Sequence, residues 1–200
     1  FADSSTFISY NANMRSLVVD KLGGCELIVF NRSDKSTDKE QLHKIVRSVS
    51  RKADIAYEYR DGHVEYDDIK DPLPFDINAD IIEIGDKDFA LWYRDLLDEP
   101  KKYSGKTVSF LGIAARDRKM PKLEFAIGRH IMTCCVDDIQ YGGVVAQWNE
   151  AEEVKTGQWM RVVGKLRFEY NDLYGEKGPV LKILNVISAP PPEEKVVTFY

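Results

Sequence analysis

The chain has 200 residues, of which 44% are hydrophobic and 30% are charged, and its formal net charge is −5. This length suits one large domain or two small ones, and neither needs a disulfide or a metal merely to fold. The acidic balance disfavours binding to a phosphate backbone, and no apolar run is long enough to cross a membrane as a helix. Three cysteines are too few for a disulfide framework.

The N-terminal residues predict short strands and one helix. Residues 1–16 are polar and small, which indicates a loosely ordered lead-in. Two apolar runs, at 17–19 and 25–30, predict strands separated by a pair of glycines. A helix is then expected to begin at a capping box formed by Thr37 and Glu40.

This predicted helix has an apolar stripe at the spacing of one helical face, made by Leu42, Ile45, Val46 and Val49. His43 lies outside the stripe, so we expect its side chain to be solvated. The residues around Gly62 predict a hairpin of two strands, 55–59 and 63–66. A helix flanked by strands predicts a small α+β module over residues 1–75.

A second domain is predicted at 81–200, after a linker at 70–80 that is rich in proline and aspartate. Its first element is a short strand at 81–84. A helix is expected next, over 86–99, because an aspartate can cap its start and a proline follows its last turn.

Five further strands are predicted at 107–115, 123–134, 142–148, 159–170 and 180–189. Gly112 lies inside the first of them, where a barrel strand would have to bend. Five strands with a short helix or loop between the third and fourth are typical of the OB fold, a small closed barrel, and a six-stranded sandwich would give the same pattern. The predicted class is therefore α+β, with a small N-terminal α+β module followed by a five-stranded OB-like β-barrel.

The segment from His130 to Asp138 gathers one imidazole, two thiols and two carboxylates. These are ligand types that zinc accepts. In an extended strand His130 and Cys134 would lie about 13 Å apart, so a shared ion requires a bend between them. The candidate metal ligands are Cys134, Cys135 and Asp138, with His130 as an added ligand and zinc as the candidate ion.

Two other interpretations of the cysteine pair stay open. Free cysteine is among the most buried residue types, so Cys134 and Cys135 are also consistent with small apolar side chains at a strand end. A disulfide between these neighbours would close a strained ring that is easily reduced. A thiol redox role follows from that geometry and predicts fast alkylation of the cysteines at neutral pH.

The predicted barrel also raises the alternative of an oligonucleotide- or oligosaccharide-binding protein. Four basic residues gather in the loop between its first two strands, a loop that OB proteins use for ligands: Arg116, Arg118, Lys119 and Lys122. Phe125 and Trp148 are the aromatic residues available to stack on bases. The net negative charge argues against a nucleic acid as the partner.

The most specific motif of the chain is Met132-Thr133-Cys134-Cys135 followed by Asp138. Less specific motifs are Ile84-Gly85-Asp86 with Phe89, Gly128-Arg129, and Gly157 with Trp159. Together these motifs resemble the soluble C-terminal domain of the two-component membrane permease subunit family, and the resemblance covers about residues 81–200.

The resemblance implies a non-enzymatic accessory or binding domain on the extracytoplasmic face of a bacterial cell membrane. Its implied partner is an integral membrane permease subunit, and a membrane anchor is expected outside this chain. The same resemblance marks Cys134, Cys135 and Asp138 as functional residues. No nucleic acid is expected as a partner.

Overall fold

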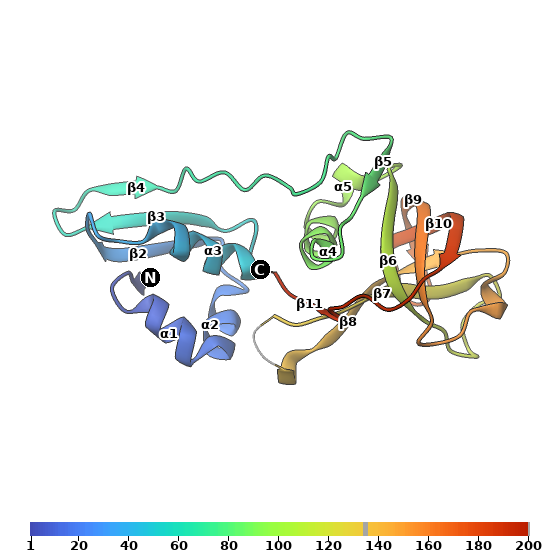
Figure 1. Ribbon diagram of the computed structural model, residues 1–200. Helices are drawn as coiled ribbons and strands as arrows, with labels where there is room; N and C mark the ends of the chain where they lie inside the picture. Colours follow the sequence, from blue (N-terminus) through green and yellow to red (C-terminus); the bar gives the residue numbers. More distant parts are fainter. Residues whose placement is uncertain (134–135, 200) are drawn as a thin grey trace. The chain divides into compact units, whose positions relative to one another are not determined.

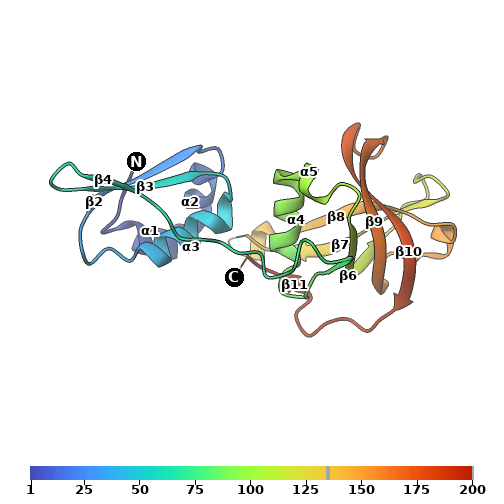
Figure 2. The same ribbon diagram turned by 90° about the horizontal axis from the view of Figure 1, so that it is seen from above.

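The computed structural model describes residues 1–133 and 136–199 and forms two compact units (Figure 1 and Figure 2). The N-terminal unit holds Phe1–Pro72 together with Thr133 and residues 136–138. The C-terminal unit holds Leu73–Met132 and the described residues from Ile139 onward. Helices and strands occur in both units, so the predicted mixed α+β class is confirmed.

In residues 1–72, four strands form one sheet in the order β1-β2-β3-β4. They are β1 (Ala2–Asp3), β2 (Leu27–Ser33), β3 (Asp54–Tyr59) and β4 (Val64–Tyr66). The first three run parallel, whereas β3 and β4 form the predicted antiparallel hairpin. The crossover from β2 to β3 contains α3 (Lys39–Val49), and all four residues of its apolar stripe are buried.

The start of the chain differs from its prediction. The expected lead-in forms β1 and α1 (Phe7–Asn13), and the apolar run at 17–19 belongs to α2 (Arg15–Leu22) rather than to a strand. The reason lies in tertiary packing, because Val18 and Leu22 share one helical face and bury it against the same core as Phe7.

The cap of α3 lies one residue later than expected. Asp38 is the N-cap residue, and its carboxylate accepts a hydrogen bond from the Gln41 amide at 3.0 Å. The Thr37 hydroxyl instead accepts a hydrogen bond from the Asp34 amide at 2.9 Å. Both side chains suit an N-cap, so the sequence alone could not choose between these neighbours.

The C-terminal unit begins with β5 (Ile81–Glu83), α4 (Phe89–Asp98) and the short α5 (Pro100–Tyr103). Helix α4 therefore starts three residues after its prediction, because Asp88 rather than Asp86 stands at the N-cap and follows a turn from Gly85. Pro100 does not simply end a helix. It occupies the first turn of α5, where its missing N–H costs no hydrogen bond.

The remaining strands of this unit are β6 (Thr107–Ala115), β7 (Glu124–Ile131), β8 (Gln140–Gln147), β9 (Trp159–Asn171), β10 (Glu176–Ser188) and β11 (Val196–Val197). Two short 3₁₀ turns lie at Val136–Asp138 and Ala151–Glu153. Within the described residues, seven strands follow the order β11-β7-β8-β10-β9-β6-β5, and β7 also pairs with β6.

That additional pairing makes the hydrogen-bonded contacts of five strands run in a ring. Strand β6 pairs with β9, β9 with β10, β10 with β8, β8 with β7, and β7 again with β6. Only the contact between β8 and β10 is parallel among these five. Figure 2 shows the strong curvature of β9 and β10.

The interior of the C-terminal unit is filled by apolar side chains from these strands and from α4. Three rings on α4 and β6 contact one another, with centroids 5.3 Å apart for Phe89 and Phe110 and 5.0 Å apart for Trp92 and Phe110. Each of the three side chains is fully buried. Helix α4 is therefore part of this core and not an appendage to the sheet.

Strands β7 and β8 approach each other unusually closely at one point. Gly128 lies opposite Gly143, and a Cβ atom on Gly128 would come within 2.0 Å of the Gly142 carbonyl oxygen. Real side chains do not tolerate such a distance from backbone atoms. The absence of a side chain at Gly128 therefore allows this part of the ring to form.

The C-terminal residues are held against β7 by a buried arginine. Strand β11 pairs in parallel with His130 and Ile131, and Arg129 donates from Nη2 to the Glu194 carbonyl oxygen at 2.6 Å. The guanidinium is 0% exposed and lies 5.0 Å from the centroid of the Trp159 ring. Burial lowers the pKa of Arg129, and the nearby Asp86 carboxylate opposes that change.

Candidate functional site

The predicted metal ligands are only partly within the described structure. Cys134 and Cys135 lie outside the described residues. Asp138 ends a 3₁₀ turn, and its Oδ1 atom accepts a hydrogen bond from the Thr133 amide at 3.1 Å. His130 lies on β7 opposite Tyr141, with the two rings edge to face at 5.7 Å.

Within residues 1–133 and 136–199, the structure contains no group of three or more His, Cys, Asp or Glu side chains placed to hold a metal ion. His130 and Asp138 alone therefore do not form a metal centre. The zinc site stays a prediction that depends on the two cysteines.

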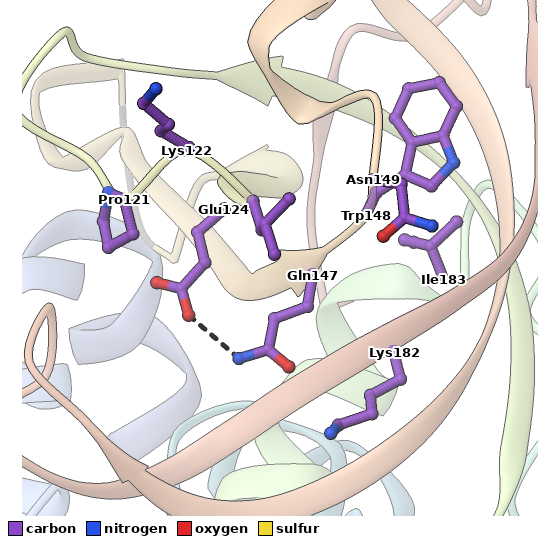
Figure 3. A pocket seen from close by; sticks show the side chains of 9 residues that line it. Pro121, Lys122, Glu124, Gln147, Trp148, Asn149, Lys182 and Ile183 are labelled. Atoms are coloured by element: carbon purple, nitrogen blue, oxygen red, sulfur yellow. Dashed lines mark hydrogen bonds between the residues drawn. The ribbon is translucent and has the colours of Figure 1, made fainter.

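The C-terminal unit has a pocket of about 520 Å³ where the loop before β7 meets the end of β8 and the middle of β10 (Figure 3). Its polar lining and one aromatic side chain are Lys122, Glu124, Gln147, Trp148, Asn149 and Lys182. Small-molecule sites in proteins have volumes of roughly 300–1,000 Å³. The pocket is therefore large enough for one small ligand.

Glu124 is the most unusual side chain of this pocket, because it is a carboxylate with only 8% exposure. Its Oε1 atom accepts hydrogen bonds from Gln147 Nε2 at 2.9 Å and from Asn171 Nδ2 at 3.0 Å. Its Oε2 atom is also buried and has no hydrogen-bond partner among the residues that the structure describes. A buried carboxylate oxygen that accepts no hydrogen bond costs roughly several kcal/mol of folding free energy, unless a ligand or a water molecule supplies the donor.

Strand pairing explains how these groups come together. Glu124 and Gln147 are directly opposite in the antiparallel pair of β7 and β8, so their side chains lie on the same face. Asn171 ends β9, where its Oδ1 atom accepts from the Leu173 amide at 2.9 Å while its amide group donates to Glu124. The site thus depends on three strands that are distant in sequence.

Two residues named for the nucleic-acid alternative lie at or near this pocket, but they differ in accessibility. Trp148 lines it, whereas Phe125 is fully buried in the core and contacts the Trp148 ring edge to face at 6.5 Å. The expectation that Phe125 is available to stack on bases is wrong, since its side chain belongs to the apolar interior. Of the four basic loop residues, Lys122 lines the pocket.

A second polar cluster lies in the N-terminal unit around His43. The expectation that His43 is solvated is wrong, because the residue is only 2% exposed. Its Nδ1 atom lies 2.7 Å from Asp67 Oδ2, and its Nε2 atom lies 3.3 Å from Asp71 Oδ2. The Tyr57 hydroxyl donates to Asp67 Oδ1 at 2.9 Å, and burial together with this carboxylate raises the pKa of Tyr57.

This cluster connects the chain after β4 to helix α3. Asp71 also lies near two arginines of the same region, 3.4 Å from Arg47 Nε and 3.9 Å from Arg51 Nη1. Both nitrogens of the His43 ring face carboxylates, so neither is aimed at a nucleophile in the arrangement of a catalytic triad. We therefore interpret this cluster as a set of contacts that holds the chain after β4 against α3.

Comparison with known proteins identifies the family. The model of the DUF1980 C-terminal domain matches residues 63–198. The chain belongs to this family. The match includes the whole of the predicted second domain except its last residues, and it adds β4 and the segment that follows.

One curated relative of this DUF1980 chain is the UPF0703 protein YcgQ of Bacillus subtilis (strain 168). It is 22% identical over 116 residues, which are 58% of this chain and 41% of the relative. The chain thus spans less than half the length of that relative. The permease context and the role of the Met-Thr-Cys-Cys motif stay predictions.

Two solved structures share limited similarity with the DUF1980 chain. One is the mitochondrial single-stranded DNA binding protein Rim1 from S. cerevisiae, with 13% identity and a TM-score of 0.26, covering 42% of this chain and 95% of Rim1. The other is RecJ from Thermus thermophilus in complex with Mg²⁺, with 10% identity and a TM-score of 0.29, covering 94% of this chain and 37% of RecJ. At these scores neither similarity carries an argument about fold or function.

Among the helices in the part of the chain that the structure describes, none has the length and apolar character needed to span a membrane.

Proposed function

We propose that the C-terminal unit is an OB-like β-barrel that acts as a ligand-binding module. The order of the five ring strands supports this proposal. Around the ring the strands follow the order β6, β7, β8, β10, β9, and β9 pairs again with β6. Strands β8 and β10, the third and the fifth in the sequence, are parallel, and the other four contacts are antiparallel. A five-stranded barrel with Greek-key pairing is the architecture of the OB fold.

The observation that carries the binding role is the buried carboxylate of Glu124. One of its oxygens is fixed by two amides, and the other faces no donor among the described residues. This group lines a pocket beside the loop between the first two ring strands. OB proteins bind ligands with that loop and with the adjacent strands, so position and chemistry support the same role.

The wider role follows from the resemblance to permease subunits. We propose that the chain is a non-enzymatic accessory domain of an integral membrane permease, on the extracytoplasmic face of the cell membrane. Zinc at Cys134, Cys135 and Asp138, with His130 as an added ligand, is part of this proposal. The ligand types support it, because thiolate, imidazole and carboxylate all coordinate zinc.

A thermal-shift screen of the full chain tests the binding role. The screen would use saccharides, amines, carboxylic acids and nucleotides, and the readout would be the unfolding midpoint of wild type and of Glu124→Gln. We expect at least one class to raise the wild-type midpoint and to leave the variant unchanged, because only a ligand of the folded pocket stabilises it by mass action. If no class raises it, or if the variant responds equally, the binding role at Glu124 is wrong.

Two separate experiments test the metal and the partner. Metal analysis of protein purified under reducing conditions should give about one zinc per chain, and a Cys134→Ser/Cys135→Ser variant should give none. A stoichiometry near zero for both would exclude zinc. Co-expression with the permease subunit, followed by detergent extraction, should yield a complex that elutes as one species, and separate elution would overturn the accessory role.

A further inference from the structure

We propose that the Glu124 pocket binds an acidic saccharide, that is, a sugar with free hydroxyl groups and one carboxylate. This inference rests on the proposed function of the C-terminal unit as a binding module and specifies the ligand of the same pocket. It follows from three properties of the lining, namely its unused acceptor, its net charge and its apolar surfaces.

The first property requires a ligand that donates a hydrogen bond. Gln147 and Asn171 each direct an amide N–H at Glu124 Oε1. Figure 3 shows the Glu124 and Gln147 side chains meeting at the pocket. The second oxygen is buried and receives nothing from any described residue. Since an ionised carboxylate is an acceptor only, a ligand that completes this site must bring an O–H or N–H group.

The second property, the charge of the lining, favours a ligand that carries both an uncharged hydrogen-bond donor and an anionic group. Lys122 and Lys182 line the same pocket as Glu124, so the lining carries two positively charged side chains and one carboxylate. A cationic amine would meet Glu124 but would be repelled by both lysines. A hydroxyl group avoids this repulsion, and a carboxylate elsewhere on the ligand would pair with the lysines.

The third property favours a ring with one apolar face. Leu123, Trp148 and Ile183 line the pocket beside the polar groups. A pyranose ring combines C–H groups on its face with hydroxyl groups on its rim. It can therefore lie against these apolar surfaces while a rim hydroxyl donates to Glu124. The volume of about 520 Å³ accommodates one or two such rings.

The test is an NMR titration of the full chain with three matched monosaccharides, D-glucuronate, D-glucose and D-glucosamine. The readouts are the side-chain amide signals of Gln147, Asn149 and Asn171 and the indole N–H signal of Trp148. We expect glucuronate to shift these signals, glucose to bind at least fivefold more weakly, and the cationic glucosamine to bind most weakly. If glucosamine bound more tightly than glucuronate, the assignment of charge would be wrong.

Three variants assign any binding to the pocket. Glu124→Gln keeps the shape and lets the new carbonyl face the two amides, but it places an N–H₂ group where the free acceptor was, so glucuronate affinity should fall at least tenfold. Lys182→Met should reduce affinity for glucuronate and leave that for glucose unchanged. Lys177→Met is the matched control, because Lys177 lies on the same strand, is exposed and does not line the pocket. Unchanged glucuronate affinity in Glu124→Gln would overturn the proposal.

The same spectra separate failure of this inference from failure of the proposed function. Butylamine, a short oligothymidine and adenosine monophosphate would be titrated in parallel. If one of them shifts the pocket signals and glucuronate does not, the saccharide class is wrong and the binding role stands. If none of the six probes shifts them, both proposals are wrong.

Discussion

Replacement of Gly128 by alanine tests whether the close approach of β7 and β8 is needed for the ring of strands. The added Cβ would lie 2.0 Å from the Gly142 carbonyl oxygen and 2.5 Å from the Gly143 Cα. Ordinary contacts begin at 3.4 Å, so the two backbones would have to separate by about 1.4 Å at this point. Both obstructing atoms belong to the backbone, so no side-chain rotation can relieve the clash.

The energetic cost follows from what that separation breaks. Overpacking of a filled interior costs about 1–3 kcal/mol. Loss of one or two strand hydrogen bonds adds about 0.5–1.5 kcal/mol each. Unfolded alanine has less conformational entropy than unfolded glycine, so this difference stabilises the folded variant by about 0.4–1 kcal/mol. We therefore expect Gly128→Ala to lower the free energy of unfolding of the C-terminal unit by about 2–4 kcal/mol.

Two further glycines provide graded controls for this experiment. At Gly112 a Cβ would meet the flexible end of Ile127 at 2.9 Å and the Gly128 carbonyl oxygen at 3.1 Å, so the cost should be smaller. At Gly24 nothing lies within 4 Å, and alanine should be nearly neutral. All three tryptophans lie in the C-terminal unit, whereas Gly24 lies in the N-terminal unit, so urea denaturation of all three variants is followed by far-UV circular dichroism, which reports both units. If Gly128→Ala costs no more than Gly24→Ala, β7 and β8 do not approach each other this closely.

Three other predictions concern polar groups. Asp67→Asn should destabilise the N-terminal unit by about 1–3 kcal/mol in urea denaturation, because one of the two carboxylate oxygens that face Tyr57 and His43 is replaced by an N–H₂ group; an unchanged midpoint would contradict this. Burial raises the pKa of Tyr174 to about 12, so the folded state favours its neutral form. Stability should therefore be intact below about pH 10 and fall between about pH 10 and 12, and a phenylalanine at this position should reduce the fall. Arg129→Met should leave the free energy of unfolding within about 1 kcal/mol of the wild-type value in urea denaturation, because it removes a buried charge along with a hydrogen bond. It should nevertheless speed amide exchange in β11 by releasing the Glu194 carbonyl, and slow exchange in the variant would show that Arg129 does not hold this strand.

The sequence predicted those elements best whose burial pattern repeats locally. Strand β6 has the bounds that its apolar run predicts, and α3 buries the whole of its predicted stripe. Helix α2 could not be predicted in the same way, because the apolar run at 17–19 is also typical of a strand. Its helical state depends on packing against the preceding helix α1 and against α3, which lies further along the chain.

The candidate pocket could not be predicted because its signal is distributed over the chain. Glu124, Gln147 and Asn171 come from three strands and meet only through the register of those strands. One signal in the sequence indicated that Glu124 is buried: it is a charged residue at the start of a strand, and the residues that follow it are apolar. The burial of His43 escapes prediction for a similar reason, since it depends on carboxylates that follow β4.

The division into domains at 1–75 and 81–200 stays a prediction. A domain is defined by its ability to fold independently, and the two compact units of the structure do not test that ability.

The ring of strands has a consequence for the order in which the chain can fold during synthesis. Strand β10 supplies the two contacts that join β8 to β9, yet it is the last of the five ring strands to leave the ribosome. Until then β8 and β9 expose unpaired backbone groups along their edges, and such edges invite pairing with other chains. The nascent chain therefore passes through a stage at which it is prone to aggregate, and that stage ends only when residues 176–188 have emerged.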